Sequence, residues 1–366
     1  MRTIKTWLAA IAVLLCSVSA SAQNFEVDGI NYRLTSEQEV QVYFDTEILS
    51  GDVVIPETVT YNGITYNVTS INKGAFQGNE SITSLIISKN ITSIGEYAFE
   101  WCNNLTSVSI LGNITSIGRN MFDGCSSLVS VTIPEGVTVI NGGAFSDCCS
   151  LTNIVFPESL TEIGYGVFEN CSKLTSIVIP QKVNLIQNGT FSGCAALKSI
   201  VVDASNKTYD SRNNCNAIIE TKTNTLIQGC ASSTIPSTVT SIGSYAFDGC
   251  SSLTALSIPN SVTEIGYCAF HGCSSMASVN IPTGVKSIYG STFMGCSSLE
   301  SIIIPFTVTS IDNYAFVGCS SLTSITIPKS VTEIRQFPFS YLYLEAQNNQ
   351  KQPEITKHKP LIINIF

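Results

Sequence analysis

Cysteine is the residue type in this sequence with the greatest capacity for chemistry. The chain has 14 cysteines, and in an exported protein that number ordinarily indicates a disulfide framework. Nine of them instead recur three residues after a phenylalanine: Cys102, Cys125, Cys148, Cys171, Cys194, Cys250, Cys273, Cys296 and Cys319. In stacked units these form a ladder whose rungs have equivalent neighbours above and below. We therefore interpret the nine as buried small hydrophobic residues and not as bridges.

Two cysteines outside this ladder lie on either side of a hairpin pattern. Cys215 and Cys230 flank two apolar runs that are joined by the polar turn Lys222-Thr223. Folding about that turn places the two cysteines opposite one another, so a local disulfide is one expectation and two separate thiols are the alternative. A zinc site is not indicated, because no Cys-x-x-Cys pair is accompanied by a second pair.

Residues that could support catalysis are scarce. His271 and His358 are the two histidines, and no nucleophile motif or Gly-rich phosphate loop accompanies them. His271 follows a phenylalanine where other units have Asp, Ser or Glu, which is typical of a solvated loop position. Glu162, Glu264 and Glu333 share one repeat position and could pair for sugar hydrolysis, although solvated surface positions explain them better. The sequence predicts a non-enzymatic protein with no cofactor.

The elements that would position these residues follow from one 23-residue interval. In the unit that begins at Phe316, Leu322, Ile325 and Ile327 alternate inward with period two, and Pro328 ends the strand. One unit cannot bury its own apolar edge, whereas stacked units form a continuous core. The sequence therefore predicts a mainly β solenoid, a leucine-rich-repeat stack of roughly 12 coils. The anchor phenylalanines of these coils are Phe76, Phe99, Phe122, Phe145, Phe168, Phe191, Phe247, Phe270, Phe293, Phe316 and Phe339.

The pattern divides the chain into four segments. Residues 1–22 are typical of a signal peptide, since basic residues precede a short apolar run and an Ala-Ser-Ala cleavage site, so we expect a secreted or cell-surface protein. Residues 23–67 are rich in β patterns but lack the repeat frame and are expected to form an N-terminal β cap. The repeats occupy residues 68–339. In residues 340–366 the pattern fails, and a cap, a flexible tail and a truncated array all fit.

A gap of 56 residues between Phe191 and Phe247 interrupts the array. Residues 203–235 are the inserted segment and include the hairpin pattern. Insertions in repeat proteins often lie on the binding face, but a tolerated surface excursion explains this one equally well. The part from Asp203 to Asn214 is rich in oxygen ligands but lacks the spacing of a calcium loop.

The outward strand face is the surface most suited to a partner. With 12% charged residues and a net charge of −9, it should be long, flat and nearly uncharged, and nucleic acid is disfavoured. Tyr97 and Trp101, on the loop edge, are candidate hot spots, or they pack between neighbouring loops. The adjacent outward column is mixed. The candidate contact column consists of Ser84, Ser107, Ser130, Asn153, Ser176, Ser278, Ser301 and Ser324.

The run Gly-Cys-Ser-Ser-Leu-Thr-Ser-Ile-Thr-Ile-Pro at 318–328, followed by Ser-Val-Thr-Glu-Ile, closely resembles the BspA-type leucine-rich repeat. This resemblance implies a surface-exposed or secreted protein with a curved stack of short strands and no catalytic residues. It also implies adhesion, with a host extracellular-matrix or cell-surface protein, or another bacterial surface, as partner. A carbohydrate-binding surface protein and a structural surface-layer component are the alternatives. No membrane span is expected in the mature chain.

Overall fold

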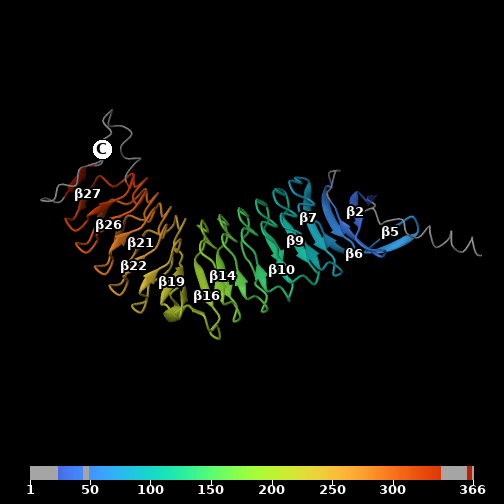
Figure 1. Cartoon of the computed structure of the whole chain (residues 1–366), viewed down its shortest axis with the longest axis horizontal. Helices are drawn as coiled ribbons and strands as arrows, with labels where there is room; N and C mark the ends of the chain where they lie inside the picture. Colours follow the sequence, from blue (N-terminus) through green and yellow to red (C-terminus); the bar gives the residue numbers. More distant parts are fainter. Residues whose placement is uncertain (1–23, 44–48, 339–360, 365–366) are drawn as a thin grey trace, which may run out of the picture.

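The computed structural model describes residues 24–43, 49–338 and 361–364. Short coils stack along one axis into a curved rod. In the view of Figure 1 its lowest part lies near β16 and β19, and both ends lie higher. The predicted β solenoid is confirmed, since the described residues contain β-strands and one 3-10 turn but no α-helix. None of the described segments is a helix long and apolar enough to cross a bilayer. The expected signal peptide, Phe339 and residues 340–360 lie outside the described residues.

The coils contribute strands to two parallel ladders, although the coil that contains Asn153 and Val155 has no strand in the first of them. Because the sequence repeats every 23 residues, equivalent positions lie beside one another, as Ser84 lies beside Ser107. The first ladder consists of β4 (Gly51–Ile55), β7 (Ile82–Ile87), β9 (Ser107–Ile110), β11 (Ser130–Thr132), β14 (Ser176–Ile179), β16 (Ser199–Val202), β21 (Ala255–Leu256), β23 (Ser278–Asn280), β25 (Ser301–Ile303) and β27 (Ser324–Ile327). The second consists of β8 (Ser93–Ile94), β10 (Ser116–Ile117), β12 (Val139–Ile140), β13 (Glu162–Ile163), β15 (Leu185–Ile186), β20 (Ser241–Ile242), β22 (Glu264–Ile265), β24 (Ser287–Ile288), β26 (Ser310–Ile311) and β28 (Glu333–Ile334).

The core between the ladders is a column of stacked phenylalanines. Ring centroids of neighbouring anchor phenylalanines lie 5.2 Å apart at Phe76–Phe99 and 5.6 Å apart at Phe145–Phe168, with nearly parallel planes. The loop around each anchor turns through left-handed residues two positions before and two positions after it. Glycine serves these positions in many coils, but Tyr97 (φ 60°) and Trp101 (φ 61°) occupy them around Phe99.

The N-terminal segment continues both ladders and closes one end of the stack. Strand β6 (Ile64–Ile71) pairs with β8, and β4 pairs with β7, so the cap supplies a strand to each ladder. The remaining cap strands form a sheet with β6 and are β1 (Asn24–Val27), β2 (Ile30–Leu34), β3 (Glu39–Val42) and β5 (Thr58–Tyr61). At the other end, β29 (Leu361–Asn364) runs antiparallel to β27 and covers its edge.

The inserted segment is built into the stack. It forms β17 (Tyr209–Asp210), a 3-10 turn at Arg212–Asn214, β18 (Ile218–Glu220) and β19 (Thr225–Gln228), and β19 then pairs in parallel with β20. Adjacent residues of β18 face opposite ways: Ile218 packs in the core of the N-terminal coils, whereas Ile219 packs with Leu226 in the core of the C-terminal coils. The hairpin therefore separates two half-cores, and the interpretation of it as a surface excursion is wrong.

This separation also explains why the expected disulfide is absent. Cys215 and Cys230 are both free, buried thiols. Cys215 packs with the C-terminal half-core and Cys230 with the N-terminal one. Cys230 Sγ lies 3.5 Å from the carbonyl oxygen of Asn216, while Cys215 Sγ lies 3.8 Å from that of Ala217. The hairpin directs the two thiols to different halves of the molecule, so the alternative of two separate thiols describes the structure.

Candidate interaction surfaces

The cysteine ladder offers no reactive group. All nine cysteines are buried and free, as interpreted from their spacing. In eight of them the thiol donates to the carbonyl oxygen of the anchor phenylalanine one coil earlier, for example Cys171 Sγ to Phe145 at 3.1 Å. Cys250 is the exception, because the inserted hairpin places Gly229 there, at 3.9 Å. Burial raises the pKa of Cys250 and of Cys319 to about 12, so both remain protonated and unreactive at neutral pH.

The histidine within the described residues has a partner that the sequence did not indicate. His271 Nδ1 lies 2.7 Å from Asp248 Oδ1, one coil earlier, and this hydrogen bond raises the pKa of the imidazole. His271 lies in a loop and is partly exposed, as expected, but its imidazole is paired with a carboxylate. Glu162, Glu264 and Glu333 lie several coils apart in the second ladder, so they form no carboxylate pair. Among the described residues no three His, Cys, Asp or Glu side chains are grouped to hold a metal ion.

The oxygen-rich stretch of the insertion is also structural. The Asn206 side chain is buried and donates to the carbonyl oxygens of Pro180 and Val183, at 2.8 and 2.9 Å. Its amide oxygen accepts from two backbone amides that follow it. Asp210 forms an ion pair with Arg212 at 2.7 Å. These oxygens are occupied by contacts within the chain.

The proposed contact column lies on first-ladder strands, except for Asn153, which lies in a coil without a strand at this position. Ser107 is flanked in register by Ser84 and Ser130, and Ser278 by Ser301. Within the described residues these hydroxyls do not bond to one another, and Ser84 donates to Asp52 at 2.6 Å. The column also includes Asn153, Ser176 and Ser324, which are half-buried or exposed. These side chains keep donors and acceptors for a partner, but nothing in their arrangement makes a pocket.

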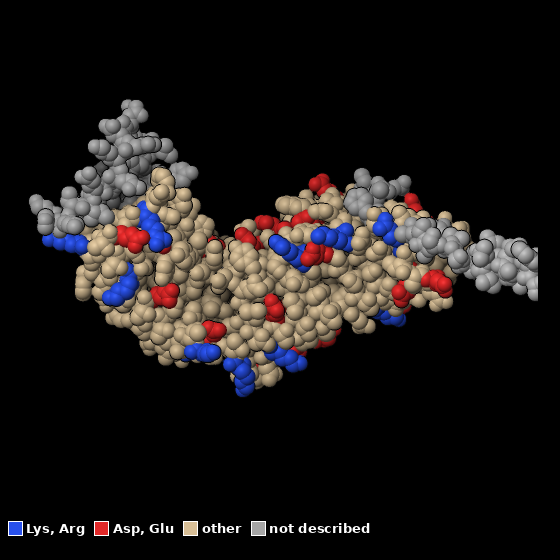
Figure 2. All heavy atoms as spheres, in the orientation of Figure 1, with Lys and Arg blue, Asp and Glu red and all other residues tan. Residues whose placement is uncertain are grey.

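The neighbouring outward column, whose residue types are mixed along the chain, contains an apolar strip. Val155, Val178 and Val201 lie on three successive coils, and 70%, 56% and 46% of their surfaces are exposed. Ile303 and Phe306 form a second exposed apolar site four coils further on. Figure 2 shows wide stretches without charged side chains on the face in view. A contiguous group of exposed apolar side chains often marks a surface that contacts another molecule, whereas single scattered ones do not.

The loop edge carries the two aromatic residues that the sequence singled out. Trp101 is half exposed and lies against Gly124 of the next coil, where a methyl group would approach the indole Cε3 to 2.6 Å. Tyr97 is half-buried, with Lys73 Nζ 4.9 Å from its ring centroid. Packing between neighbouring loops therefore describes part of each side chain, while contact with a partner stays a prediction. Their left-handed backbone is a strained state for an aromatic residue.

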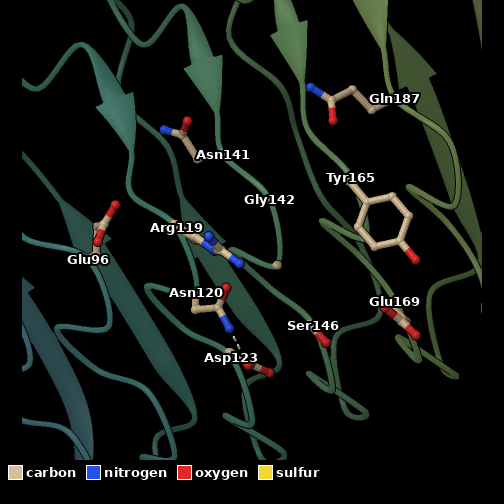
Figure 3. Close-up of a pocket in the computed structure, with 12 residues that line it drawn as sticks. Glu96, Arg119, Asn120, Asp123, Asn141, Gly142, Ser146, Tyr165, Glu169 and Gln187 are labelled. Atoms are coloured by element: carbon tan, nitrogen blue, oxygen red, sulfur yellow. Dashed lines mark hydrogen bonds between the residues drawn. The ribbon is translucent and has the colours of Figure 1, made fainter.

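Beside this edge, residues of five successive coils line an open groove of about 520 Å³ (Figure 3). Its floor and walls are polar apart from the ring of Tyr165. Asp123 accepts a hydrogen bond from Asn120 at 2.7 Å, whereas the side chains of Arg119 and Glu169 have no hydrogen-bond partner among the described residues. Burial, and then the carboxylates of Asp147 and Asp248, raise the pKa of Glu169. The sequence did not reveal this groove, because its residues come from several repeat positions.

The stacked coils, the two ladders and the inward Leu, Ile and Phe positions define a leucine-rich-repeat solenoid. The BspA type leucine rich repeat region matches in six copies over residues 57–152, 94–220 and 219–345. The chain belongs to the BspA-type leucine-rich-repeat family. No curated protein matches the sequence significantly.

Solved structures of bacterial proteins share this architecture. A leucine rich cell surface protein from Faecalibacterium prausnitzii is 29% identical, with a TM-score of 0.61 over 87% of this chain and 95% of that one. A leucine-rich repeat protein from Eubacterium ventriosum is 26% identical, with a TM-score of 0.55 over 91% of this chain and 97% of that one. The pneumococcal vaccine antigen PcpA shares the fold at 18% identity, with a TM-score of 0.63. The alignment covers 86% of this chain and 85% of PcpA.

Proposed function

We propose that this protein is an exported, non-enzymatic scaffold that adheres to a host extracellular-matrix or cell-surface protein, or to another bacterial surface, through its outward strand face. The observation that supports this proposal is the strip of Val155, Val178 and Val201 beside the hydroxyl column. Exposed apolar side chains flanked by uncharged polar groups resemble the centre and rim of a protein–protein interface. The likeness to a cell surface protein from F. prausnitzii agrees with an exported location.

The test is binding of residues 23–366 to immobilised fibronectin, fibrinogen, laminin and collagen, and to whole bacterial cells. The triple variant Val155→Ser, Val178→Ser, Val201→Ser should lose at least tenfold in affinity for the target that the wild type binds, because apolar contacts at the centre of an interface dominate its energy. This variant should fold, since Ser109 and Thr132 occupy the same column in other coils.

The matched control is Val129→Ser, which removes an exposed valine from a different outward position. That variant should bind as the wild type does. Unchanged binding by the triple variant would exclude the strand face. Saturable self-association without any bound target would favour a surface-layer role instead.

A further inference from the structure

Three exposed aromatic side chains on the loop edge share one arrangement. Trp101, Tyr165 and Tyr267 each lie against a glycine of the next coil, and 50%, 50% and 49% of their surfaces are exposed. A methyl group at Gly189 would lie 3.3 Å from Tyr165 Cε2, and one at Gly290 would lie 3.5 Å from Tyr267 Cδ1. Each ring thus lies close to the backbone of a glycine in the next coil, while the side chain stays half open to solvent.

Tyr165 is the one among these three that lines the groove of Figure 3. The figure shows its ring beside Glu169, with Gln187 above it and Arg119 and Asn141 across the groove. Its ring also packs edge-on against Tyr245, with centroids 6.5 Å apart, which fixes its orientation. The groove therefore combines one oriented aromatic ring with several polar side chains.

Several of these polar groups are not engaged with other residues. The guanidinium of Arg119, the carboxylate of Glu169 and the hydroxyl of Tyr165 form no hydrogen bond with any described residue. Asn141 donates its amide N–H to the carbonyl oxygen of Ile117 at 2.9 Å, which leaves its amide oxygen able to accept. The groove thus presents both donors and acceptors beside an aromatic ring.

We infer that this groove binds a neutral glycan, with Tyr165 stacking on the apolar face of one pyranose ring and Arg119, Asn141 and Glu169 hydrogen-bonding its hydroxyls. A pyranose has an apolar C–H face that suits the negative face of an aromatic ring, and hydroxyls that both donate and accept. Coils rise by about 4.8 Å, close to the length of one sugar unit in an extended chain. The glycan would therefore run along the stack.

The charges of the groove restrict the class of glycan. Glu96, Asp123 and Glu169 line it together with one cation, Arg119. Burial, and then the carboxylates of Asp147 and Glu100, raise the pKa of Asp123, although its hydrogen bond with Asn120 opposes this. Further negative charge would be repelled here, so uronic-acid and sulfated polymers are excluded. This site is separate from the strand face and does not depend on the adhesion proposed there.

The experiment titrates residues 23–366 by calorimetry with maltohexaose, cellohexaose and mannohexaose, and with hexagalacturonate as the anionic probe. At least one neutral hexasaccharide should bind, and hexagalacturonate should not. Tyr165→Ala should weaken binding at least tenfold, whereas Tyr165→Phe should stay within about threefold because the ring is retained. Arg119→Ala should weaken binding severalfold.

The control is Tyr314→Ala, which removes a similarly exposed tyrosine of the same loop edge outside the groove, and it should bind normally. Thermal unfolding of each variant separates lost binding from lost fold. The inference is overturned if none of the neutral hexasaccharides binds, if Tyr165→Ala binds as the wild type does, or if hexagalacturonate binds equally well. The triple valine variant should keep glycan binding, so this result and that of the adhesion test are independent.

Discussion

The thiol of Cys148 donates to the backbone carbonyl oxygen of Phe122, 3.2 Å away in the preceding coil. That carbonyl also accepts the backbone amide of Cys125 at 3.1 Å, so each contact ties an anchor loop to the next. Cysteine suits the position because its side chain is small, apolar and a weak donor. The repeated cysteine is therefore a structural link between coils.

Removing one of these links should measure its contribution. Cys148→Ala loses a buried sulfur and a donor and should lower the free energy of unfolding by about 1–2 kcal/mol. Denaturant unfolding measures this loss. Cys149→Ala, at the half-buried neighbouring position, is the matched control and should change stability by less than about 0.5 kcal/mol. Equal effects of the two substitutions would show that the ladder contact contributes nothing.

Thiol reactivity should follow burial. Of the cysteines in the described residues, Cys149 and Cys268 are partly exposed and the others are buried. In the native protein iodoacetamide should modify these two alone, and the rest only after unfolding. Burial and then Asp248 raise the pKa of Cys268, so its alkylation rate should still be rising as the pH passes 9. Mass spectrometry locates the labels, and a Cys215–Cys230 bridge in the unreduced protein would contradict the structure.

Substitution by glycine should change the stability of the protein differently at two similarly exposed tyrosines, because only one of them has a left-handed backbone. Tyr314 has φ 61°, whereas Tyr267 is not among the residues with positive φ. Tyr314→Gly relieves a conformation that costs roughly 1 kcal/mol in an L-residue, so stability should be unchanged or should rise. Tyr267→Gly should destabilise by about 1–2 kcal/mol, because it adds backbone entropy and loses the Tyr289 ring contact. Thermal unfolding compares the two, and equal losses would refute the strain.

The inserted hairpin should behave as core. Leu226 is fully buried, so Leu226→Ala should destabilise by about 2–5 kcal/mol, as for a leucine of the repeats. Lys222→Ala, in the exposed turn of the same hairpin, should cost less than about 0.5 kcal/mol. Denaturant unfolding of both variants tests whether the hairpin is part of the core. If it were a surface loop, both substitutions would have similar small effects on stability.

The His271–Asp248 pair should give a pH-dependent stability. The hydrogen bond to Asp248 raises the pKa of His271 above the ordinary value of 6.5, so its contribution is complete below that pH. It is lost as the pH rises through the higher folded-state pKa. Compared with His271→Gln, the wild type should be more stable at pH 5.5 by less than about 1 kcal/mol, because the pair is partly solvated. The difference in melting temperature should shrink towards pH 9, and a constant difference would refute the pairing.

The sequence predicted the parts of the molecule that repeat. Translation by one unit sets the register of both ladders, the Phe stack and the cysteine rungs, so one coil determines the others. The hairpin was misjudged because its burial on both sides depends on two half-cores, with Ile218 and Ile219 facing opposite ways. The groove was missed because its residues share no motif. One signal was available, namely an aromatic residue followed in the next coil by a glycine, as in Tyr165 and Gly189.

The partition between the half-cores has a mechanical consequence. A molecule held at one end and pulled from the other is loaded along the stack, where bonds between coils break in succession and not all at once. Since Ile218 and Ile219 engage different half-cores, we expect the hairpin to be the boundary at which such peeling halts. The coils on one side of the hairpin would then lengthen and absorb tension while those on the other side keep their shape and any ligand bound there.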